Sequence, residues 1–349
     1  MCEITKKEQK TVNPLTMKYS VIVPVFNRPK EVEELLESLA QQTYKDFEVV
    51  IIEDGSTETC EEVGRRYEKD LTIRYHYKQN SGPGDSRNVG MEKGTGEYLI
   101  FFDSDCIIPP HYFENVENYL AHDELDTFGG PDNAKSTFSD VQKAINYAMT
   151  SFITTGGVRG KKSKLDQFQP RSFNMGIKKE VYKKVGGFSD IHPGEDPELS
   201  YRIMNAGFKV GLIEDAYVYH KRRIDFSKFI KQVYKFGVVR IILMKWFPDK
   251  FKLTYTFPSI FLLGSIGLVL LSLVVSVYFL APLLLLVLIL FLDALARTKN
   301  LKVTLLAVLA SFIQLYSYGW GFLKSAYRVM LLKKPEREAF VNFFFKNRK

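Results

Sequence analysis

The chain has 349 residues, of which 46% are hydrophobic, and a net charge of +8. This length suffices for one sizeable α/β domain and a further segment. The three cysteines, Cys2, Cys60 and Cys106, are scattered, which excludes a zinc pattern and a disulfide framework and predicts a reducing, cytosolic setting for the soluble part. The first residues are polar and charged, so no signal peptide is expected.

The positive charge is concentrated in two short segments. Residues 1–220 have a net charge of −8, whereas residues 221–252 carry +8 and residues 324–349 carry +6. A nucleic-acid-binding stripe would be spread differently, so nucleic acid is not an expected partner. The two basic segments flank the long apolar runs, as is typical of chain that faces anionic lipid headgroups.

The first part of the chain alternates between strand and helix patterns. Apolar runs and helical spacings predict strands at 21–23, 47–52, 73–77 and 98–102, with helices at 29–41, after 56 and at 89–93 between them. This order predicts a right-handed, doubly wound parallel sheet. Ser56 or Thr57 is the expected N-cap of the second helix.

The most informative stretch is Tyr98–Cys106. Its five apolar or aromatic residues predict a strand buried on both faces, and Asp103 and Asp105 follow directly after it. Open α/β sheets bind ligands at the carboxyl ends of their strands, where Asp54 is also expected. Two carboxylates this close repel each other unless a cation lies between them, and Mg²⁺ or Mn²⁺ shared with a phosphate is the natural choice. The alternative is a polar turn that merely ends the strand.

Taken together, these motifs resemble the family 2 glycosyltransferases of the GT-A fold, a Rossmann-like mixed α/β sheet with flanking helices. The resemblance rests on residues 23–28 (VPVFNR), 53–56 (EDGS), 87–90 (RNVG), 103–105 (DSD, the D-x-D metal motif of the family), 174–176 (NMG) and 194–202 (GEDPELSYR). The resemblance covers about residues 18–225. No single motif is specific to the family, but the order and spacing of all the motifs together are.

The resemblance implies roles for individual residues. The implied nucleotide-sugar contacts are Pro24, the backbone near Val25 and Asp54 for the base, Arg87 for the ribose and diphosphate, Asp103 for the nucleoside and Asn174 for the donor sugar. The implied metal ligands are Asp105 and His220; Asp196 would be the catalytic base, with Glu195 and Arg202 in the acceptor-side motif.

Each of these residues also has a plainer interpretation. Glu195 and Asp196 could be an acidic helix start followed by proline in the first turn. Arg87 could form a salt bridge on its own helix, and His220 could be a core or surface histidine. Asn174 could simply be part of a turn.

The chemistry of sugar transfer agrees with the implied roles. The departing nucleotide diphosphate develops negative charge, which a metal held by Asp105 and the cation of Arg87 would neutralise. The incoming hydroxyl must lose its proton to a placed carboxylate, here Asp196, as it attacks. A base on the sugar face opposite the diphosphate gives a single in-line displacement with inversion.

The last third of the chain predicts attachment to a membrane. Residues 225–247 predict an amphipathic helix with a basic face, lying in the headgroup plane or else packed on the sheet. The 36 residues from Phe257 to Leu292 carry no charge, and Pro282 divides this run into two expected spans, about 257–277 and 280–297.

Residues 301–322 are a third candidate span with a polar second half. Three crossings would place the basic tail opposite the catalytic domain, against the positive-inside tendency, and the sequence leaves this conflict open. The expected organisation is a polar extension (1–17), a catalytic domain (18–225), an interface helix and basic linker (226–252), transmembrane segments (253–323) and a basic tail (324–349).

These observations predict a multi-pass protein of the cell inner membrane with a cytoplasmic catalytic domain. It would be an inverting glycosyltransferase that uses Mn²⁺ or Mg²⁺ and a nucleotide-diphosphate sugar, expected to be a UDP-sugar. The expected acceptor is a polyprenyl-diphosphate-linked saccharide, because an anchored domain meets substrates confined to the bilayer. Residues 232–240 depart from the Q-x-x-R-W motif of cellulose- and hyaluronan-type synthases, which argues against a polymerase.

Two alternatives stay open at this point. The first is an enzyme that transfers one sugar directly to a polyprenyl phosphate, making a lipid-monophosphate sugar. The second is a non-catalytic membrane scaffold that binds a nucleotide sugar or lipid, although a scaffold has no need of Asp103, Asp105 and Asp196.

Overall fold

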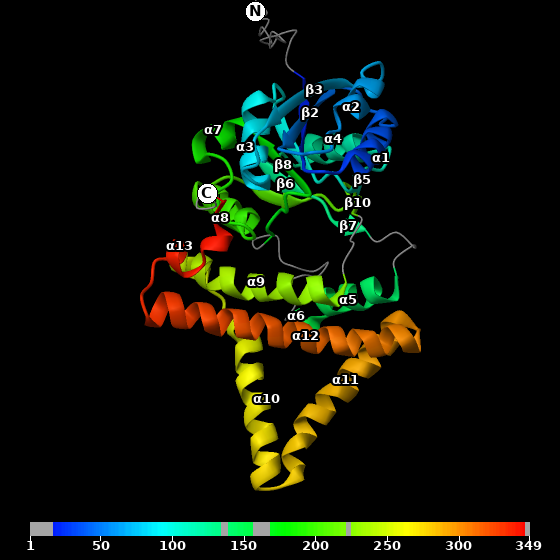
Figure 1. Ribbon diagram of the computed structural model, residues 1–349. Helices are drawn as coiled ribbons and strands as arrows, with labels where there is room; N and C mark the ends of the chain where they lie inside the picture. The colour runs from blue at the N-terminus through cyan, green and yellow to red at the C-terminus, as the bar shows by residue number, and fades with distance from the viewer. Residues whose placement is uncertain (1–16, 134–138, 156–167, 221–224, 346–349) are drawn as a thin grey trace, which may run out of the picture.

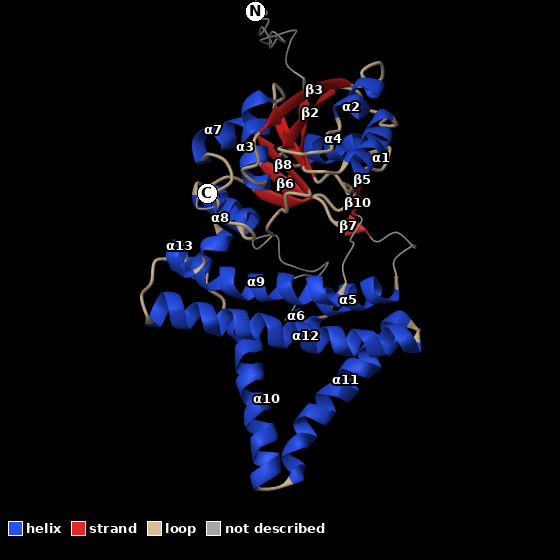
Figure 2. Cartoon of the chain, viewed as in Figure 1, coloured by secondary structure: helices blue, strands red, loops and turns tan. Residues whose placement is uncertain are grey.

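The computed structural model describes residues 17–133, 139–155, 168–220 and 225–345. An α/β domain lies above a layer of long helices, from which a pair of helices projects on the far side (Figure 1). Figure 2 shows the strands gathered between helices in the centre of the α/β domain.

A seven-stranded mixed sheet forms the α/β domain, in the order β3-β2-β1-β4-β8-β6-β9. Its strands are β1 (Tyr19–Val25), β2 (Phe47–Asp54), β3 (Thr72–Lys78), β4 (Tyr98–Phe102), β6 (Thr127–Gly129), β8 (Asn174–Lys178) and β9 (Val210–Leu212). The first four strands of the chain pair in parallel, as expected, whereas β8 runs antiparallel to both β4 and β6. The carboxyl ends of β1, β2 and β4 therefore meet at one edge.

A small second sheet lies beside that edge. It contains β5 (Cys106–Ile107), β10 (Val218–His220) and β7 (Asp132–Asn133), in the order β5-β10-β7. The helices of the α/β domain are α1 (Pro29–Ala40), α2 (Glu61–Tyr67), α3 (Pro83–Lys93), α4 (Tyr112–His122), α7 (Lys179–Val185) and α8 (Glu195–Asn205).

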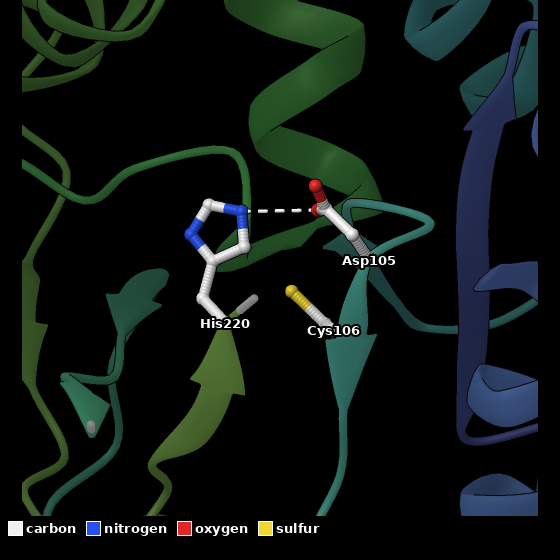
Figure 3. A group of neighbouring side chains, drawn as sticks. All are labelled: Asp105, Cys106 and His220. Atoms are coloured by element: carbon white, nitrogen blue, oxygen red, sulfur yellow. Dashed lines mark hydrogen bonds and ion pairs between the residues drawn. The ribbon is translucent and has the colours of Figure 1, made fainter. Parts of the chain in front are cut away.

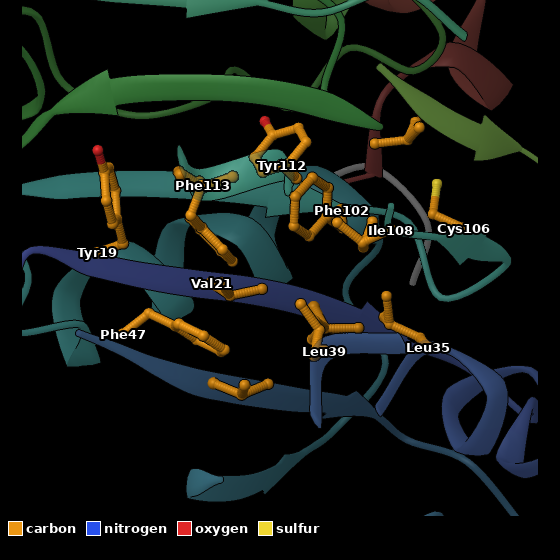
Figure 4. Close-up of a cluster of buried hydrophobic side chains, with 14 of the residues drawn as sticks. Tyr19, Val21, Leu35, Leu39, Phe47, Phe102, Cys106, Ile108, Tyr112 and Phe113 are labelled. Carbon is orange, nitrogen blue, oxygen red and sulfur yellow. The ribbon is translucent and has the colours of Figure 1, made fainter. Parts of the chain in front are cut away.

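Alternating residues of the central strands build two separate cores. Val21 of β1 and Phe102 of β4 pack with α1 and α4 on one face of the sheet (Figure 4). Ile22 and Phe101 point to the other face and pack with α3, α7 and α8. Because both faces of the sheet are covered, the sequences of the central strands are mostly apolar and do not alternate between apolar and polar residues.

Two local predictions differ from the structure. Helix α3 begins at Pro83 rather than near residue 89, because proline suits the first turn of a helix. The N-cap of α2 is Cys60 and not Ser56 or Thr57. The hydroxyls of Ser56 and Thr57 are bound by Glu53 and Asn27 instead.

The helix layer below the α/β domain comes from three distant parts of the chain. Helices α5 (Asp140–Thr150), α9 (Phe226–Trp246) and α12 (Leu301–Ser325) lie along one another (Figure 1). Close packing depends on Gly237 and Gly321, since a Cβ at either position would lie 2.2 Å from a main-chain oxygen of the facing helix. The apolar stripe of α9, expected to face lipid, is thereby buried, with Phe229 and Val233 inside.

Helices α10 (Phe257–Val274) and α11 (Ala281–Thr298) form the projecting pair. They match the two expected spans, with Pro282 in the first turn of α11, and the one-turn helix η4 (Val277–Leu280) joins them. By length and composition, α10, α11 and α12 are each capable of crossing a membrane. However, α12 lies across the ends of α10 and α11 rather than beside them (Figure 1).

Part of the expected basic tail is folded. After α12 the chain continues through a π-helical segment (Ala326–Leu331), α13 (Glu336–Ala339) and a short 3₁₀ turn, η6 (Val341–Phe343). The remaining helices are the short α6 (Phe152–Thr155) and the 3₁₀ turns η2 (Pro248–Lys250) and η3 (Leu253–Thr256).

Candidate active site

Asp105 and His220 face each other where β4 ends (Figure 3). Asp105 lies in the turn between β4 and β5, and His220 is the last residue of β10, which pairs with β5 so that His220 lies opposite Cys106. The His220 Nε2 is 3.0 Å from the Asp105 Oδ1. The imidazole also stacks on Phe173, with ring centroids 5.1 Å apart, which fixes its orientation.

The charges around Asp105 keep it ionised. Burial raises the pKa of the Asp105 carboxyl, but His220 and Arg28 outweigh this effect and hold the pKa below its usual range. The Arg28 Nη1 donates to the Asp105 Oδ2 over 2.7 Å. The ionised carboxylate of Asp105 can therefore serve as a ligand for a cation. Its Oδ1 faces His220, and its Oδ2 is bound by Arg28.

The residues fit a divalent cation. Ligand atoms of Asp105, Cys106 and His220 all lie within 4.8 Å of one another. Burial raises the pKa of the Cys106 thiol well above its ordinary value, so the sulfur is protonated and a poor ligand for a hard ion. A carboxylate and an imidazole remain, which leave further coordination positions for phosphate oxygens.

Arg87 connects the two halves of the site. It lies on α3 and is buried; its Nη2 donates to Asp103 over 2.8 Å, and its Nη1 lies 3.7 Å from Glu195. Burial lowers the pKa of Arg87, yet Asp103, Asp196 and Glu195 raise it overall. Among the described residues, its Nε and Nη1 have no hydrogen-bond partner. Its partners lie on other elements, which argues against a salt bridge within its own helix.

Asp196 occupies the start of α8 beside Arg87. Burial, followed by the negative charge of Glu195, raises the pKa of Asp196 to about 6. Burial would raise the pKa of Glu195 too, but His192 and Arg87 lower it overall. The Oδ1 of Asp196 is buried and has no hydrogen-bond partner within the described part of the chain. A carboxylate with a pKa near neutrality and a free oxygen is suited to accept a proton.

The residues predicted to hold the nucleotide base lie at the ends of β1 and β2. Pro24 and Val25 end β1, and Val25 is buried. Asp54 ends β2, and its carboxylate accepts hydrogen bonds from Lys78 and from the main-chain amides of Ser81 and Gly82. Asp54 therefore holds the loop that leads into α3, and its contact with a base stays a prediction.

The structure favours supporting roles for two other predicted residues. Asn174 is fully buried on β8; its Oδ1 accepts from Tyr112, and its Nδ2 donates to the carbonyl of Ala216. Arg202 pairs with Glu198 on α8 and donates to the carbonyls of Val185 and Gly187, so it ties α8 to the end of α7. Their predicted places beside the donor sugar and in the acceptor-side motif stay predictions.

Sequence reasoning missed three residues that the fold brings to the site. Arg28 binds the Asp105 carboxylate, His192 Nδ1 lies 2.8 Å from Glu195 Oε1, and Ser172 hydrogen-bonds Asp196. Arg28 stands in a quoted motif and could have been considered. His192 and Ser172 lie in loops whose sequence carries no chemical signal, so only the folded chain identifies them.

Part of the chain is similar to proteins that are already known. Residues 20–186 match the model of the family described as glycosyl transferase family 2. An uncharacterized glycosyltransferase of Rickettsia felis is 41% identical over 111 residues, which is 32% of this chain and 18% of that protein. Glycosyltransferase AglE of Haloferax volcanii is 25% identical over 244 residues, which is 68% of this chain and 77% of that protein.

Among solved structures, the chain resembles the mannosyltransferase PcManGT from Pyrobaculum calidifontis, determined in complex with GDP-Man and Mn²⁺. The TM-score is 0.62 at 16% sequence identity, covering 89% of this chain and 88% of that one. This likeness concerns the fold. In the three Rickettsia relatives matched over about a hundred residues, the aligned part is less than a fifth of their length. Residues 20–186, just under half of the chain, therefore match glycosyl transferase family 2, and the mixed α/β sheet has the GT-A fold.

Proposed function

We propose that the protein is an inverting glycosyltransferase that moves a sugar from a nucleotide-diphosphate donor to an acceptor at the membrane surface. The main support for this proposal is the position of Arg87. Arg87 is a buried cation whose Nε and Nη1 find no hydrogen-bond partner among the described residues, and it forms ion pairs with both Asp103 and Glu195, the neighbour of Asp196. A diphosphate bound at Arg87 would thus lie within reach of both the Asp105 site and the carboxylate of Asp196.

The roles of the residues follow from their charges and protonation states. Asp105 and His220 would hold Mn²⁺ or Mg²⁺, which when bound supplies Lewis-acid stabilisation of the leaving diphosphate. Arg87 would donate hydrogen bonds to the same diphosphate and stabilise its developing charge. Asp196 would take the proton from the acceptor hydroxyl as the new glycosidic bond forms and the bond to the diphosphate breaks.

We place the acceptor at the membrane because of the helices below the site. The donor is proposed to be a UDP-sugar, and the acceptor a polyprenyl-diphosphate-linked saccharide. Anchoring confines both the enzyme and such an acceptor to two dimensions and raises their effective concentration. Direct transfer to a polyprenyl phosphate is the alternative within the same chemistry, and a binding scaffold is the alternative without chemistry.

A donor screen tests this proposal. Purified protein in detergent is incubated with UDP- and GDP-sugars, with and without Mn²⁺ and lipid extract, and release of nucleotide diphosphate is measured. We expect release with one donor class only when metal and lipid are both present. A sugar found on a lipid monophosphate would select the alternative acceptor. Nucleotide binding without turnover for every donor and lipid tested would contradict the proposal and favour the scaffold.

We also propose that the chain crosses the bilayer twice, through α10 and α11 alone. Each has 18 residues, about 27 Å at 1.5 Å per residue, which approaches the thickness of a hydrocarbon core. Helix α12 lies along α9 and α5, and its buried face includes Ala307, Ala310 and Ser311. Two crossings put the basic segments 221–252 and 324–349 on the same side as the α/β domain, which resolves the charge conflict.

Cysteine labelling in sealed vesicles checks this topology. In a background with Cys2 replaced by serine, we compare Glu68→Cys in the α/β domain, Ser276→Cys at the α10–α11 turn and Lys334→Cys after α12. A membrane-impermeant maleimide should label Glu68→Cys and Lys334→Cys from the same side and leave Ser276→Cys unlabelled from that side. Labelling of Glu68→Cys and Lys334→Cys from opposite sides would mean three crossings.

A further inference from the structure

Residues 336–345, which we call the C-terminal strap, return from the membrane helices to the α/β domain. In Figure 1 the strap is the red end of the chain beside α8. Lys245 Nζ of α9 binds Glu336 over 2.6 Å at its start. Phe340, Phe343 and Phe344 of the strap are buried, and Phe344 is completely inaccessible to solvent. The strap is therefore packed into the molecule and is not a solvated tail.

The strap pairs with the loop that precedes α8. Ile191 and Phe344 form an antiparallel bridge. The main-chain amide of His192 donates to the Phe343 carbonyl over 2.7 Å, and that of Phe345 donates to the Asp190 carbonyl over 3.0 Å. The guanidinium of Arg337 makes two hydrogen bonds to the Asp190 carboxylate, at 2.5 and 2.8 Å. A bidentate pair of this kind fixes orientation as well as distance.

This loop leads directly into the proposed base. Gly194 is the N-cap of α8, and Glu195 and Asp196 are the first two residues of the helix. His192, whose amide is held by the strap, binds the Glu195 carboxylate through Nδ1 at 2.8 Å. Glu195 in turn lies next to Arg87. The strap thus sets the position of the main chain from which this group of charged side chains extends.

The ring of Phe345 also contacts the loop on the nucleotide side. It lies 5.6 Å from the His192 ring between centroids. It also packs against Gly82, where an added Cβ would meet the ring at 2.5 Å. The amide of Gly82 donates to Asp54 Oδ2 over 2.9 Å. One aromatic ring therefore spans the loop held by Asp54 and the loop that carries Asp196.

We propose that the C-terminal strap is a positioning element of the active site, in which Arg337 and Phe345 hold the His192–Glu195 loop against the Gly82 loop. The proposal rests on the proposed transferase function. Because the strap follows α12 in the chain, correct placement of Asp196 depends on docking of the helix layer beneath the α/β domain. The residues act through their neighbours and need not touch a substrate.

Single substitutions in the full-length protein test this role. Phe345→Ala and Arg337→Ala should each lower kcat by about tenfold or more, with a smaller change in donor KM, because small displacements of a catalytic group have large effects. Phe345→Tyr should keep kcat close to the wild-type value, because the contacts of the ring remain. Val341→Ala is the matched control, because Val341 lies on the same strap and its side chain is half exposed.

The Arg337–Asp190 pair gives a second, independent measurement. Arg337→Asp and Asp190→Arg should each reduce kcat, and the double exchange should recover a large part of the loss. Hydrogen exchange should become faster at residues 80–84 and 190–196 in Phe345→Ala, while α9 and α12 keep their protection. Unchanged kcat and exchange in these variants, with only a lower Tm, would overturn the proposal and leave the strap a purely stabilising segment.

These readouts separate the two proposals. If the wild-type protein transfers no sugar, the proposed function fails, but the exchange rates and the affinity for Mn²⁺–nucleotide still report whether the strap orders both loops. If the wild-type protein is active and the strap variants are equally active, only the positioning role fails.

Discussion

Asp196→Asn should reduce kcat by two to four orders of magnitude, the range expected when a positioned general base is removed. The amide has nearly the same shape as the carboxylate and cannot accept the proton of the acceptor hydroxyl. Binding of metal and nucleotide should persist, because Arg87, Asp105 and His220 are untouched. Single-turnover transfer and nucleotide affinity are the two measurements. Retention of more than a tenth of wild-type kcat would contradict the assignment of the base.

The pKa of Asp196 also fixes the expected pH dependence. The folded protein raises this pKa to about 6, and the base must be ionised, so kcat/KM should fall as the pH drops below about 6. The stability effect has the opposite sense. A carboxyl with a raised pKa binds its proton more tightly in the folded state, so its contribution to stability falls as the pH rises from about 4 to about 6. Asp196→Asn should therefore not lower Tm at neutral pH.

A surface substitution of the same kind provides the control. Asp215 is exposed in the loop before β10, and Asp215→Asn changes one carboxylate to an amide as Asp196→Asn does. It should leave kcat, the acid limb of the pH profile and Tm unchanged. A loss of kcat in both variants would point to the change in net charge rather than to the loss of a base.

The sequence was sufficient to predict the central strands and the acidic end of β4. The runs at 49–52 and 98–102 are continuous and apolar, and such a pattern is typical of a strand covered on both faces. Asp103 and Asp105 could be placed because they follow a strand directly. The antiparallel direction of β8 could not, since strand direction is decided by distant pairing and leaves no local mark on residues 174–178.

Sequence-based prediction is least reliable where the same residue pattern fits both a structural and a functional role. The family resemblance places Asn174 beside the donor sugar and Arg202 in the acceptor-side motif, and in the fold their side chains hydrogen-bond Ala216 and Glu198. The apolar stripe of α9 has the periodicity of a helix that lies on lipid, but in the fold it packs on α12 and α5. Periodicity identifies a face that must be covered, and the fold alone decides what covers it.

Asp105→Asn should abolish metal-dependent nucleotide binding and lower kcat by about a hundredfold or more, because charge stabilisation at the leaving group contributes several kcal/mol. The amide keeps the shape but removes the anionic ligand. His220→Ala should have a smaller effect, since an imidazole that ligates a metal is neutral and adds no charge to the metal site. Mn²⁺ affinity is measured by electron paramagnetic resonance and nucleotide affinity by calorimetry, so neither depends on turnover.

A substitution of Arg28 distinguishes a metal-binding role of Asp105 from a role as an ion-pair partner alone. It binds the same carboxylate at 2.7 Å and competes with a cation for Asp105. If Asp105 is a metal ligand, Arg28→Gln should leave Mn²⁺ affinity unchanged or increase it, in contrast to Asp105→Asn. If Asp105 serves only as the partner of Arg28, the two substitutions should have matching effects on stability, and neither should alter Mn²⁺ binding. The opposite responses of Mn²⁺ affinity to Arg28→Gln and Asp105→Asn are therefore the result that identifies the metal site.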